Sequence, residues 1–129
     1  MDPTAALHLA TSTKIVATIA ALVFSGIGVH LLLAPGGGAS FFGMPMSNPE
    51  GHAFVRTTGA RNIGLSLTAL ALIALDARLG LAAMLVAASI IAGLDAAIVS
   101  RQSSASKSAK HWVYLVGLSG AGFWVGLVG

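Results

Sequence analysis

The chain has 129 residues, the length of one domain; 56% of them are hydrophobic and only 9% are charged. Because a soluble domain usually carries about a quarter charged residues, the seven basic and four acidic residues here cannot cover a water-exposed surface, and most of that surface should face lipid. The absence of cysteine excludes disulfides and thiolate sites, and the formal charge of +3, without a basic stripe interleaved with aromatics, argues against nucleic-acid binding.

Four apolar runs are each long enough to cross a bilayer, which takes roughly 20 residues. In chain order they cover about residues 15–34, 57–75, 79–100 and 111–128. The first run is too long for the apolar part of a signal peptide, and no convincing cleavage site of small residues precedes the loop that follows. We therefore predict one domain, residues 1–129, that is all-α and forms an integral membrane antiparallel four-helix bundle.

Two of the three connections are simple. Residues 76–78 form a very short turn, so the second and third runs should make an antiparallel hairpin. Residues 101–110 are polar, basic and rich in serine, which is typical of a solvated loop.

The connection at residues 35–56 is different. Its three prolines and five glycines break regular structure, yet its FFGMPM segment is too apolar for a freely solvated linker. Long connections often serve as lids or binding loops, so we expect Phe41, Phe42, Met44 and Met46 to pack against the mouth of the bundle. A loop lying at the lipid interface is the alternative.

Basic residues indicate which side of the membrane each connection occupies. Four spans place both termini on one side and the first and third connections on the other. The connection side carries more basic residues than the terminal side: Arg56, Arg101, Lys107 and Lys110 against Lys14 and Arg78. The positive-inside rule then predicts cytoplasmic connections, with both termini outside or in a lumen.

Three ionisable residues lie at one depth in three different spans. His30, Arg61 and Asp95 are each four or five residues from the connection-side end of their run, roughly 6–8 Å below the same surface. A charge inside a bilayer costs about 2.5–3.5 kcal/mol on insertion scales, and pairing in the bundle interior lowers that cost. Aspartate is too short to reach the interface as arginine does, so we predict that Asp95 pairs with Arg61 inside the bundle.

The second span also suggests a polar face. Thr57, Arg61, Gly64 and Thr68 follow one another at spacings of four, three and four, which makes one helical stripe that we expect to face inward. Asn62 belongs to the neighbouring stripe. Small and hydroxyl residues of this kind suit close helix packing.

Histidine suggests proton transfer but not a metal site. His30 has an unperturbed pKa near 6.5, which would suit acid–base work, although a hydrogen-bonded packing role is the alternative. His52 and His111 lie in or beside the connections and could reach the same region. No HExxH or paired-histidine spacing occurs, so neither a metal nor another cofactor is predicted.

The stretch FVRTTGARNIGLSLTALALIAL, residues 54–75, resembles a signature of small four-span DoxX-like membrane proteins, which include domains of unknown function in bacteria and fungi. The positions that fit are Arg56, Gly59, Ala60, Arg61 and Gly64, and Asp95 looks like the intramembrane acid of the family's third helix. The resemblance implies a four-helix membrane bundle. It implies no settled activity, because some DoxX-like proteins are linked to quinone-dependent oxidation while other small membrane bundles act as isomerases or cyclases.

The first functional hypothesis is a pocket for an apolar small molecule or a quinone. Arg61, Asp95 and His30 would be the catalytic residues of an isomerase or cyclase, with Asp95 or His30 moving the proton and Arg61 holding a carbonyl or tuning Asp95. The further substrate-binding candidates are Asn62, Thr57, Thr68, Phe41, Phe42 and Tyr114.

The alternative is a non-catalytic accessory subunit of a quinone-linked membrane complex. Gly122 and Gly126 form a GxxxG pair that would let helices approach closely, within the bundle, in a homo-oligomer or against a membrane partner. A transporter or channel ranks last, because no second row of inward charges lines a path. Whether the chain is an enzyme stays open at this point.

Overall fold

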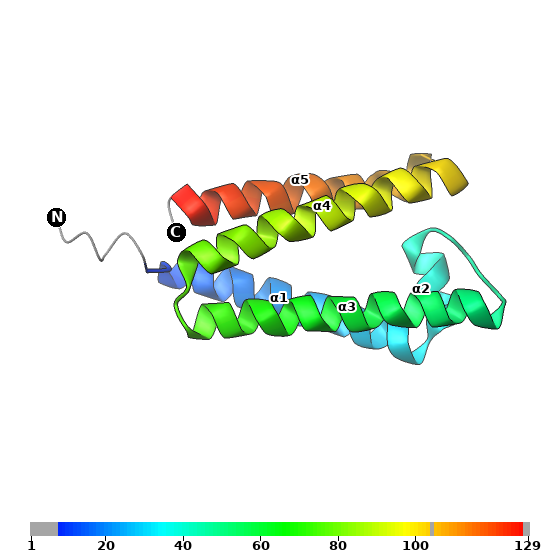
Figure 1. Ribbon diagram of the computed structural model, residues 1–129, viewed down its shortest axis with the longest axis horizontal. Helices are drawn as coiled ribbons and strands as arrows, with labels where there is room; N and C mark the ends of the chain where they lie inside the picture. Colours follow the sequence, from blue (N-terminus) through cyan, green and yellow to red (C-terminus); the bar gives the residue numbers. More distant parts are fainter. Residues whose placement is uncertain (1–7, 104, 128–129) are drawn as a thin grey trace.

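The computed structural model describes residues 8–103 and 105–127 of the chain. Across these residues the fold is all-α, as predicted, and contains no strand. The helices are α1 (Thr11–Leu33), α2 (Pro35–Phe42), α3 (Pro49–Ala74), α4 (Arg78–Gln102) and α5 (Ala105–Leu127) (Figure 1). Four of them are long and run antiparallel along one axis, and the short helix α2 lies at one end.

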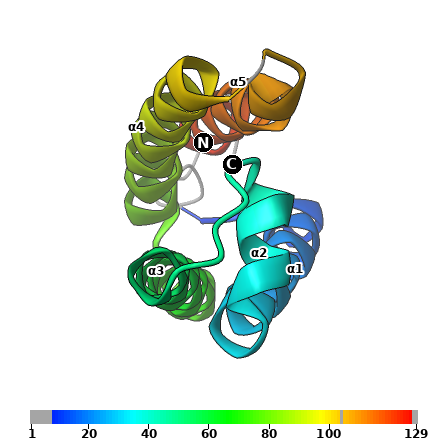
Figure 2. The same ribbon diagram turned by 90° about the vertical axis from the view of Figure 1, so that its right-hand side faces the viewer.

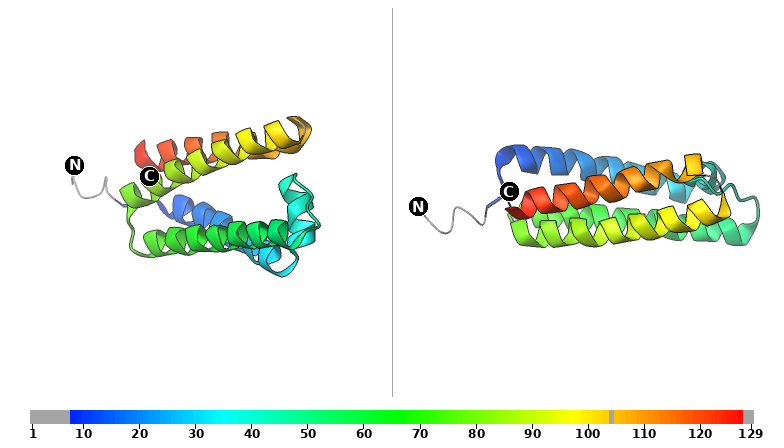
Figure 3. Two further views of the ribbon diagram at one scale, coloured as in Figure 1. Left: turned by 45° about the vertical axis from the view of Figure 1, so that its right-hand side comes forward. Right: turned by 90° about the horizontal axis from the view of Figure 1, so that it is seen from above.

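The four long helices are arranged as two pairs. Helix α1 packs along α3 and α4 packs along α5, whereas α3 and α4 touch only sparsely although a short turn joins them. The pairs meet near that turn and diverge toward the end that holds α2 (Figure 3). Seen from that end, the α4–α5 pair stands apart from the α1–α3 pair, with α2 beside α1 (Figure 2). The predicted turn is therefore present, but its two helices do not pack along each other.

Glycine permits the closest approaches within each pair. A Cβ added to Gly28 of α1 would lie 2.8 Å from the carbonyl oxygen of Gly59 in α3, which is closer than real Cβ contacts come. In the other pair, a Cβ on Gly122 of α5 would lie 2.9 Å from Cγ2 of Val86, and one on Gly126 would lie 3.5 Å from Cβ of Ala82. The Gly122–Gly126 motif is therefore used between α5 and α4 of the same chain.

The connection at residues 35–56 is mostly helical, and the expected break in regular structure is confined to residues 43–48, between α2 and α3. Pro35 and Pro49 each stand at the first position of a helix, where proline is favoured because its missing N–H would have no partner there. Asn48 caps α3 by accepting a hydrogen bond of 3.0 Å from the Gly51 N–H. Helix α2 ends at Gly43, whose φ of 99° lies in the left-handed region.

The polar segment at residues 101–110 is also largely helical rather than a solvated loop, since α4 continues to Gln102 and α5 begins at Ala105. Helix α1 likewise begins at Thr11, before the apolar run. Lysine and glutamine are good helix formers, so these helices extend past the apolar pattern that indicated them.

Polar contacts hold the end of the molecule at the α3–α4 turn. Asp76, at a φ of 54°, accepts hydrogen bonds of 2.9 Å from the Leu9 N–H and the Lys14 ammonium, and its carboxylate also contacts His8. The Leu9 N–H, followed by Lys14, holds the pKa of Asp76 well below its usual range. These contacts tie the segment before α1 to the turn between α3 and α4.

At the same end, Arg78 joins the two helices of the other pair. Its Nε donates to the Val125 carbonyl at 2.8 Å, and Nη2 donates to the Gly126 carbonyl at 2.9 Å. A guanidinium at the C-terminal end of α5 satisfies carbonyls that have no partner within the helix, and it opposes the negative end of the helix dipole.

Two of the described helices, α1 and α4, are long and apolar enough to cross a membrane. Most of their surface is exposed, and the exposed side chains include Val16, Ile19, Ile90 and Leu94. Two such helices are weak evidence for a membrane when taken alone. The fold therefore allows membrane association, while the four spans and their sidedness stay predictions.

Candidate functional site

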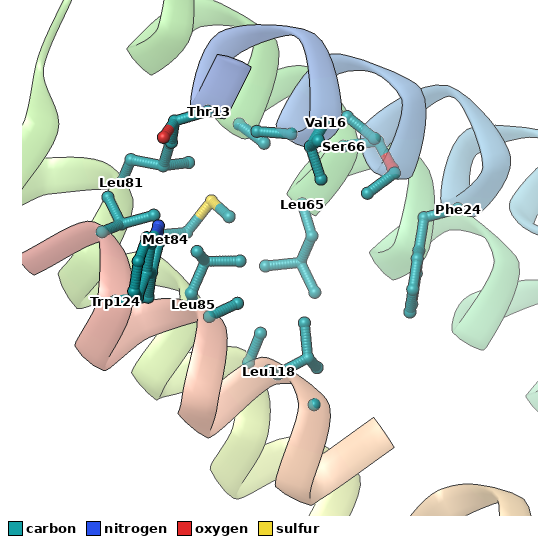
Figure 4. A pocket seen from close by; sticks show the side chains of 18 of the residues that line it. Thr13, Val16, Phe24, Leu65, Ser66, Leu81, Met84, Leu85, Leu118 and Trp124 are labelled. Atoms are coloured by element: carbon teal, nitrogen blue, oxygen red, sulfur yellow. The ribbon is translucent and has the colours of Figure 1, made fainter. Parts of the chain in front are cut away.

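An apolar groove lies between the two helix pairs, with a volume of about 580 Å³. Val16 and Phe24 of α1, Leu65 of α3, Leu85 of α4, and Leu118 and Trp124 of α5 converge on it (Figure 4). Its size is within the usual range for small-molecule sites, roughly 300–1,000 Å³. The groove exists because α3 and α4 diverge from their common turn and leave the space between the pairs open along one side.

A second, smaller space of about 60 Å³ lies toward the α2 end, and we call it the polar cavity. It shares Phe24 with the apolar groove, so the two spaces are neighbours along α1. Its remaining lining comes from α1, α2, α3 and α5: Ile27, Leu31, Phe41, Phe42, Arg61, Asn62, Lys110, His111 and Tyr114. Polar side chains from α3 and α5 therefore gather where the apolar groove ends.

A series of ring contacts joins three helices beside the polar cavity. The ring centroids of Phe24 and Tyr114 are 5.8 Å apart, those of Tyr114 and His111 6.4 Å, and those of His111 and Phe42 4.7 Å. His111 Nε2 lies 2.9 Å from the Phe42 carbonyl oxygen. Because that oxygen can only accept, Nε2 carries a proton and donates to it.

Arg61 and Asp95 form the predicted pair. Arg61 Nη2 lies 3.0 Å from Asp95 Oδ2, and the two side chains are 37% and 18% exposed. The contact uses one guanidinium nitrogen, not the two-pronged geometry that arginine often makes with a carboxylate. The Arg61 Nε is buried and has no acceptor among the described residues.

Other polar groups at the cavity also have no protein partner. Within the described part of the chain, the Asn62 amide and the Tyr114 hydroxyl make no hydrogen bond. The Lys110 ammonium makes no ion pair there and lies over the Phe41 ring, 4.2 Å from its centroid. Burial lowers the pKa of Lys110. The cavity thus holds more hydrogen-bonding capacity than the protein itself uses.

The structure gathers most of the predicted site residues but not all of them. Arg61, Asn62, Phe41, Phe42 and Tyr114 line the polar cavity, and Asp95 is tied to it through Arg61. His30, Thr57 and Thr68 are exposed and line neither space.

The expectation that Thr57, Gly64 and Thr68 face inward was wrong. The two threonine hydroxyls instead donate to carbonyls of their own helix, Phe54 at 2.7 Å and Gly64 at 2.9 Å. The buried face of α3 is the neighbouring stripe, which contains Val55, Thr58, Gly59, Ser66 and Ala69. One residue along a helix is a rotation of about 100°, so an error of one position turns the whole face outward.

Sequence reasoning did not single out Lys110 or the apolar partners Phe24, Ile27 and Leu31. Lys110, His111 and Tyr114 are spaced so that all three fall on one side of α5, and this spacing was the available signal. His52 does not line the cavity, because its Nε2 is 3.1 Å from the Met46 carbonyl oxygen.

The segment between α1 and α3 packs on the bundle in part. Met46 packs against a cluster of Leu31, Ala39 and Val55, and the Phe42 ring contacts the His111 ring at a tilt of 60°, so both side chains pack on the bundle as predicted. Phe41 remains 46% exposed beneath Lys110.

Within the described residues, no group of three or more His, Cys, Asp or Glu side chains could hold a metal ion. No curated protein and no solved structure matches the chain. A family model described as a domain of unknown function, DUF4267, matches residues 21–125, which include Arg61, Asp95 and Lys110. Since the match covers most of the sequence, from α1 to α5, the chain belongs to the DUF4267 family of domains of unknown function.

Proposed function

We propose that this protein is a four-span membrane protein that binds an apolar small molecule with a polar head. One observation carries the proposal: the apolar groove of about 580 Å³ adjoins, at Phe24, a polar cavity whose Asn62 and Tyr114 side chains make no hydrogen bond to the described residues. The tail of the ligand would lie in the groove and its head in the cavity. The Nε of Arg61, which also lines this cavity, is buried and has no acceptor among the described residues; a polar group in that state is costly, and a ligand head would supply the missing acceptor.

The membrane part of the proposal is supported by length and surface. The four long helices have 23 to 26 residues, which gives about 35–39 Å each and exceeds a hydrocarbon core of about 30 Å. Large apolar side chains are exposed on α5 as well as on α1 and α4, among them Val113, Val116 and Phe123. In water this surface would favour aggregation, whereas in lipid it needs no partner.

An acid–base reaction is an extension of this proposal. Asp95 is held by Arg61, but neither Asp95 nor His30 lines either space. Binding is therefore the function that the geometry supports best. A quinone, the kind of molecule to which some DoxX-like proteins are linked, is one apolar molecule whose carbonyl oxygens would accept hydrogen bonds from the Arg61 Nε–H and the Tyr114 hydroxyl. An accessory subunit would need a docking face other than Gly122 and Gly126, which α4 already covers.

Photo-crosslinking tests the proposal. A medium-chain alkyl alcohol with a diazirine at the far end of its chain would be added to the protein in phosphatidylcholine nanodiscs. We expect saturable labelling that maps to the end of the groove away from Phe24 and the polar cavity, near Val16 and Trp124. Unlabelled alcohol should compete for that labelling.

Two glycine variants give a matched comparison. A Cβ added at Gly117, which lines the groove, or at Gly64, which lines neither space, would meet no atom within 4 Å. Gly117→Leu should fill the groove and reduce saturable labelling about tenfold, while Gly64→Leu should leave it unchanged. Labelling that does not saturate, or that is equal in both variants, would show ordinary lipid contact and overturn the proposal.

A further inference from the structure

The polar cavity also points to the chemical class of the ligand. We propose that the ligand is a single-chain amphiphile whose head is a carboxylate, bound between Arg61, Lys110 and Tyr114. This inference rests on the function proposed above and adds the head group to it.

Charge at the α2 end of the bundle favours an anion. Of the described residues, five basic and two acidic ones lie at that end, and the five basic residues are Arg56, Arg61, Arg101, Lys107 and Lys110. Asp95 already pairs with Arg61, so the cation facing the cavity without a carboxylate among the described residues is Lys110. A carboxylate in the cavity would give Lys110 the counter-charge that the protein does not provide.

The hydrogen-bonding groups of the cavity are mainly donors. The Arg61 Nε–H, the Lys110 ammonium and the Tyr114 hydroxyl can all donate. The Asn62 amide can donate or accept, and so can Nδ1 of His111, according to whether the ring carries one proton or two. A carboxylate accepts on two oxygens and donates nothing, so it fits this set better than an alcohol or an ammonium group does. Charge-assisted hydrogen bonds of this type are also roughly twice as strong as neutral ones.

Size limits both parts of the ligand. A water molecule needs roughly 10–15 Å³ of such space, so about 60 Å³ accommodates roughly four to six water-sized groups. A carboxylate fits such a space, whereas a phosphocholine or sugar head does not. Along α1 the groove runs from Ser12 to Phe24, roughly 18 Å, which suits one extended alkyl chain of medium length.

Competition between ligands that share one alkyl chain and differ only in the head group tests the inference. Laurate, lauryl alcohol and laurylamine would each displace the diazirine alcohol from the protein in phosphatidylcholine nanodiscs at about pH 8. We expect laurate to compete at about a tenfold lower concentration than lauryl alcohol, and laurylamine to compete no better than the alcohol.

Lysine variants separate binding at the cavity from partitioning into the disc. Lys110→Gln should remove the advantage of laurate, about tenfold, without changing competition by lauryl alcohol, and Lys110→Glu should make laurylamine the best competitor. Lys107 is exposed and lines neither space, so Lys107→Gln and Lys107→Glu serve as controls and should behave as wild type. The three competitors partition into the nanodisc lipid to different extents, and comparing each variant with wild type cancels that difference.

The outcomes distinguish the two proposals. Equal competition by laurate and lauryl alcohol, still blocked by Gly117→Leu, would overturn the carboxylate inference and leave the groove as a binding site. A preference for laurate that the two Lys107 variants reduce as much as the Lys110 variants do would also overturn it, because the preference would then come from the general charge of that end. Absence of saturable labelling in wild type would overturn both proposals.

Discussion

The ion pair of Arg61 and Asp95 connects two helices that otherwise barely touch. Helices α3 and α4 diverge from their turn, and the 3.0 Å contact between these side chains spans the opening. The pair was predictable because one acid and one base lie at matching depths in antiparallel spans. The face of α3 was not predictable in the same way, since Thr57 and Thr68 are as small and polar as the buried Thr58 and Ser66. Arginine is long enough to reach Asp95 from the edge of the buried face.

We expect the charges of Arg61 and Asp95 to be energetically coupled. Arg61→Ala and Asp95→Ala should each lower the melting temperature, because each leaves the other charge uncompensated in a partly buried setting. The double variant should lower the free energy of unfolding by less than the sum of the two single variants, and the difference should be about 0.5–3 kcal/mol. Thermal unfolding in nanodiscs, followed by circular dichroism, measures the cycle. Strict additivity would show that the pair contributes nothing to stability.

At the scale of single elements, helix α2 could not be predicted from the composition of its segment. Proline and glycine read as breakers, but Pro35 begins α2, Pro49 begins α3, and only Gly43 ends a helix. What distinguishes these positions is the local hydrogen bonding, such as the Asn48 cap on α3, which composition alone does not reveal. The apolar FFGMPM segment did indicate packing on the bundle, and Phe42 and Met46 confirm it.

The two ends of α2 should respond differently to alanine. Gly43 has a φ of 99°, and an added Cβ would lie 3.2 Å from the Lys107 carbonyl oxygen, so Gly43→Ala should cost about 1–2 kcal/mol and lower the melting temperature. Gly37 is helical, and an added Cβ would meet nothing closer than His30 Nε2 at 3.8 Å. Gly37→Ala should therefore be neutral or slightly stabilising. Equal effects of the two variants in thermal unfolding would contradict the conformation assigned to Gly43.

At the scale of the whole molecule, the hydropathy pattern predicted four long helices but not their grouping. Periodicity reports that a helix has an apolar face, and in lipid every face can be apolar, so it does not say which helix packs on which. The pairing depends on close contacts such as Gly28 against Gly59, and glycine is too common here for any one to be singled out. The apolar groove depends on which helices pack together, so it could not be predicted from the sequence for the same reason.

The proposed topology can be tested because the chain has no cysteine of its own. Arg56, Arg101, Lys107 and Lys110 lie at the α2 end and Lys14 and Arg78 at the other, so the positive-inside rule places the α2 end in the cytoplasm. Single cysteines replacing exposed residues would report each end: Ser47→Cys before α3, Gln102→Cys at the end of α4, and Leu75→Cys at the α3–α4 turn.

In intact cells, a membrane-impermeant maleimide should label Leu75→Cys directly. It should label Ser47→Cys and Gln102→Cys only after the membrane is permeabilised, and the cysteine-free wild type should stay unlabelled throughout. Reversed labelling of all three sites would keep four spans and invert their sidedness. Labelling of Ser47→Cys and Gln102→Cys from opposite sides of the membrane would contradict four spans, because α3 and α4 together must return the chain to the side from which it came.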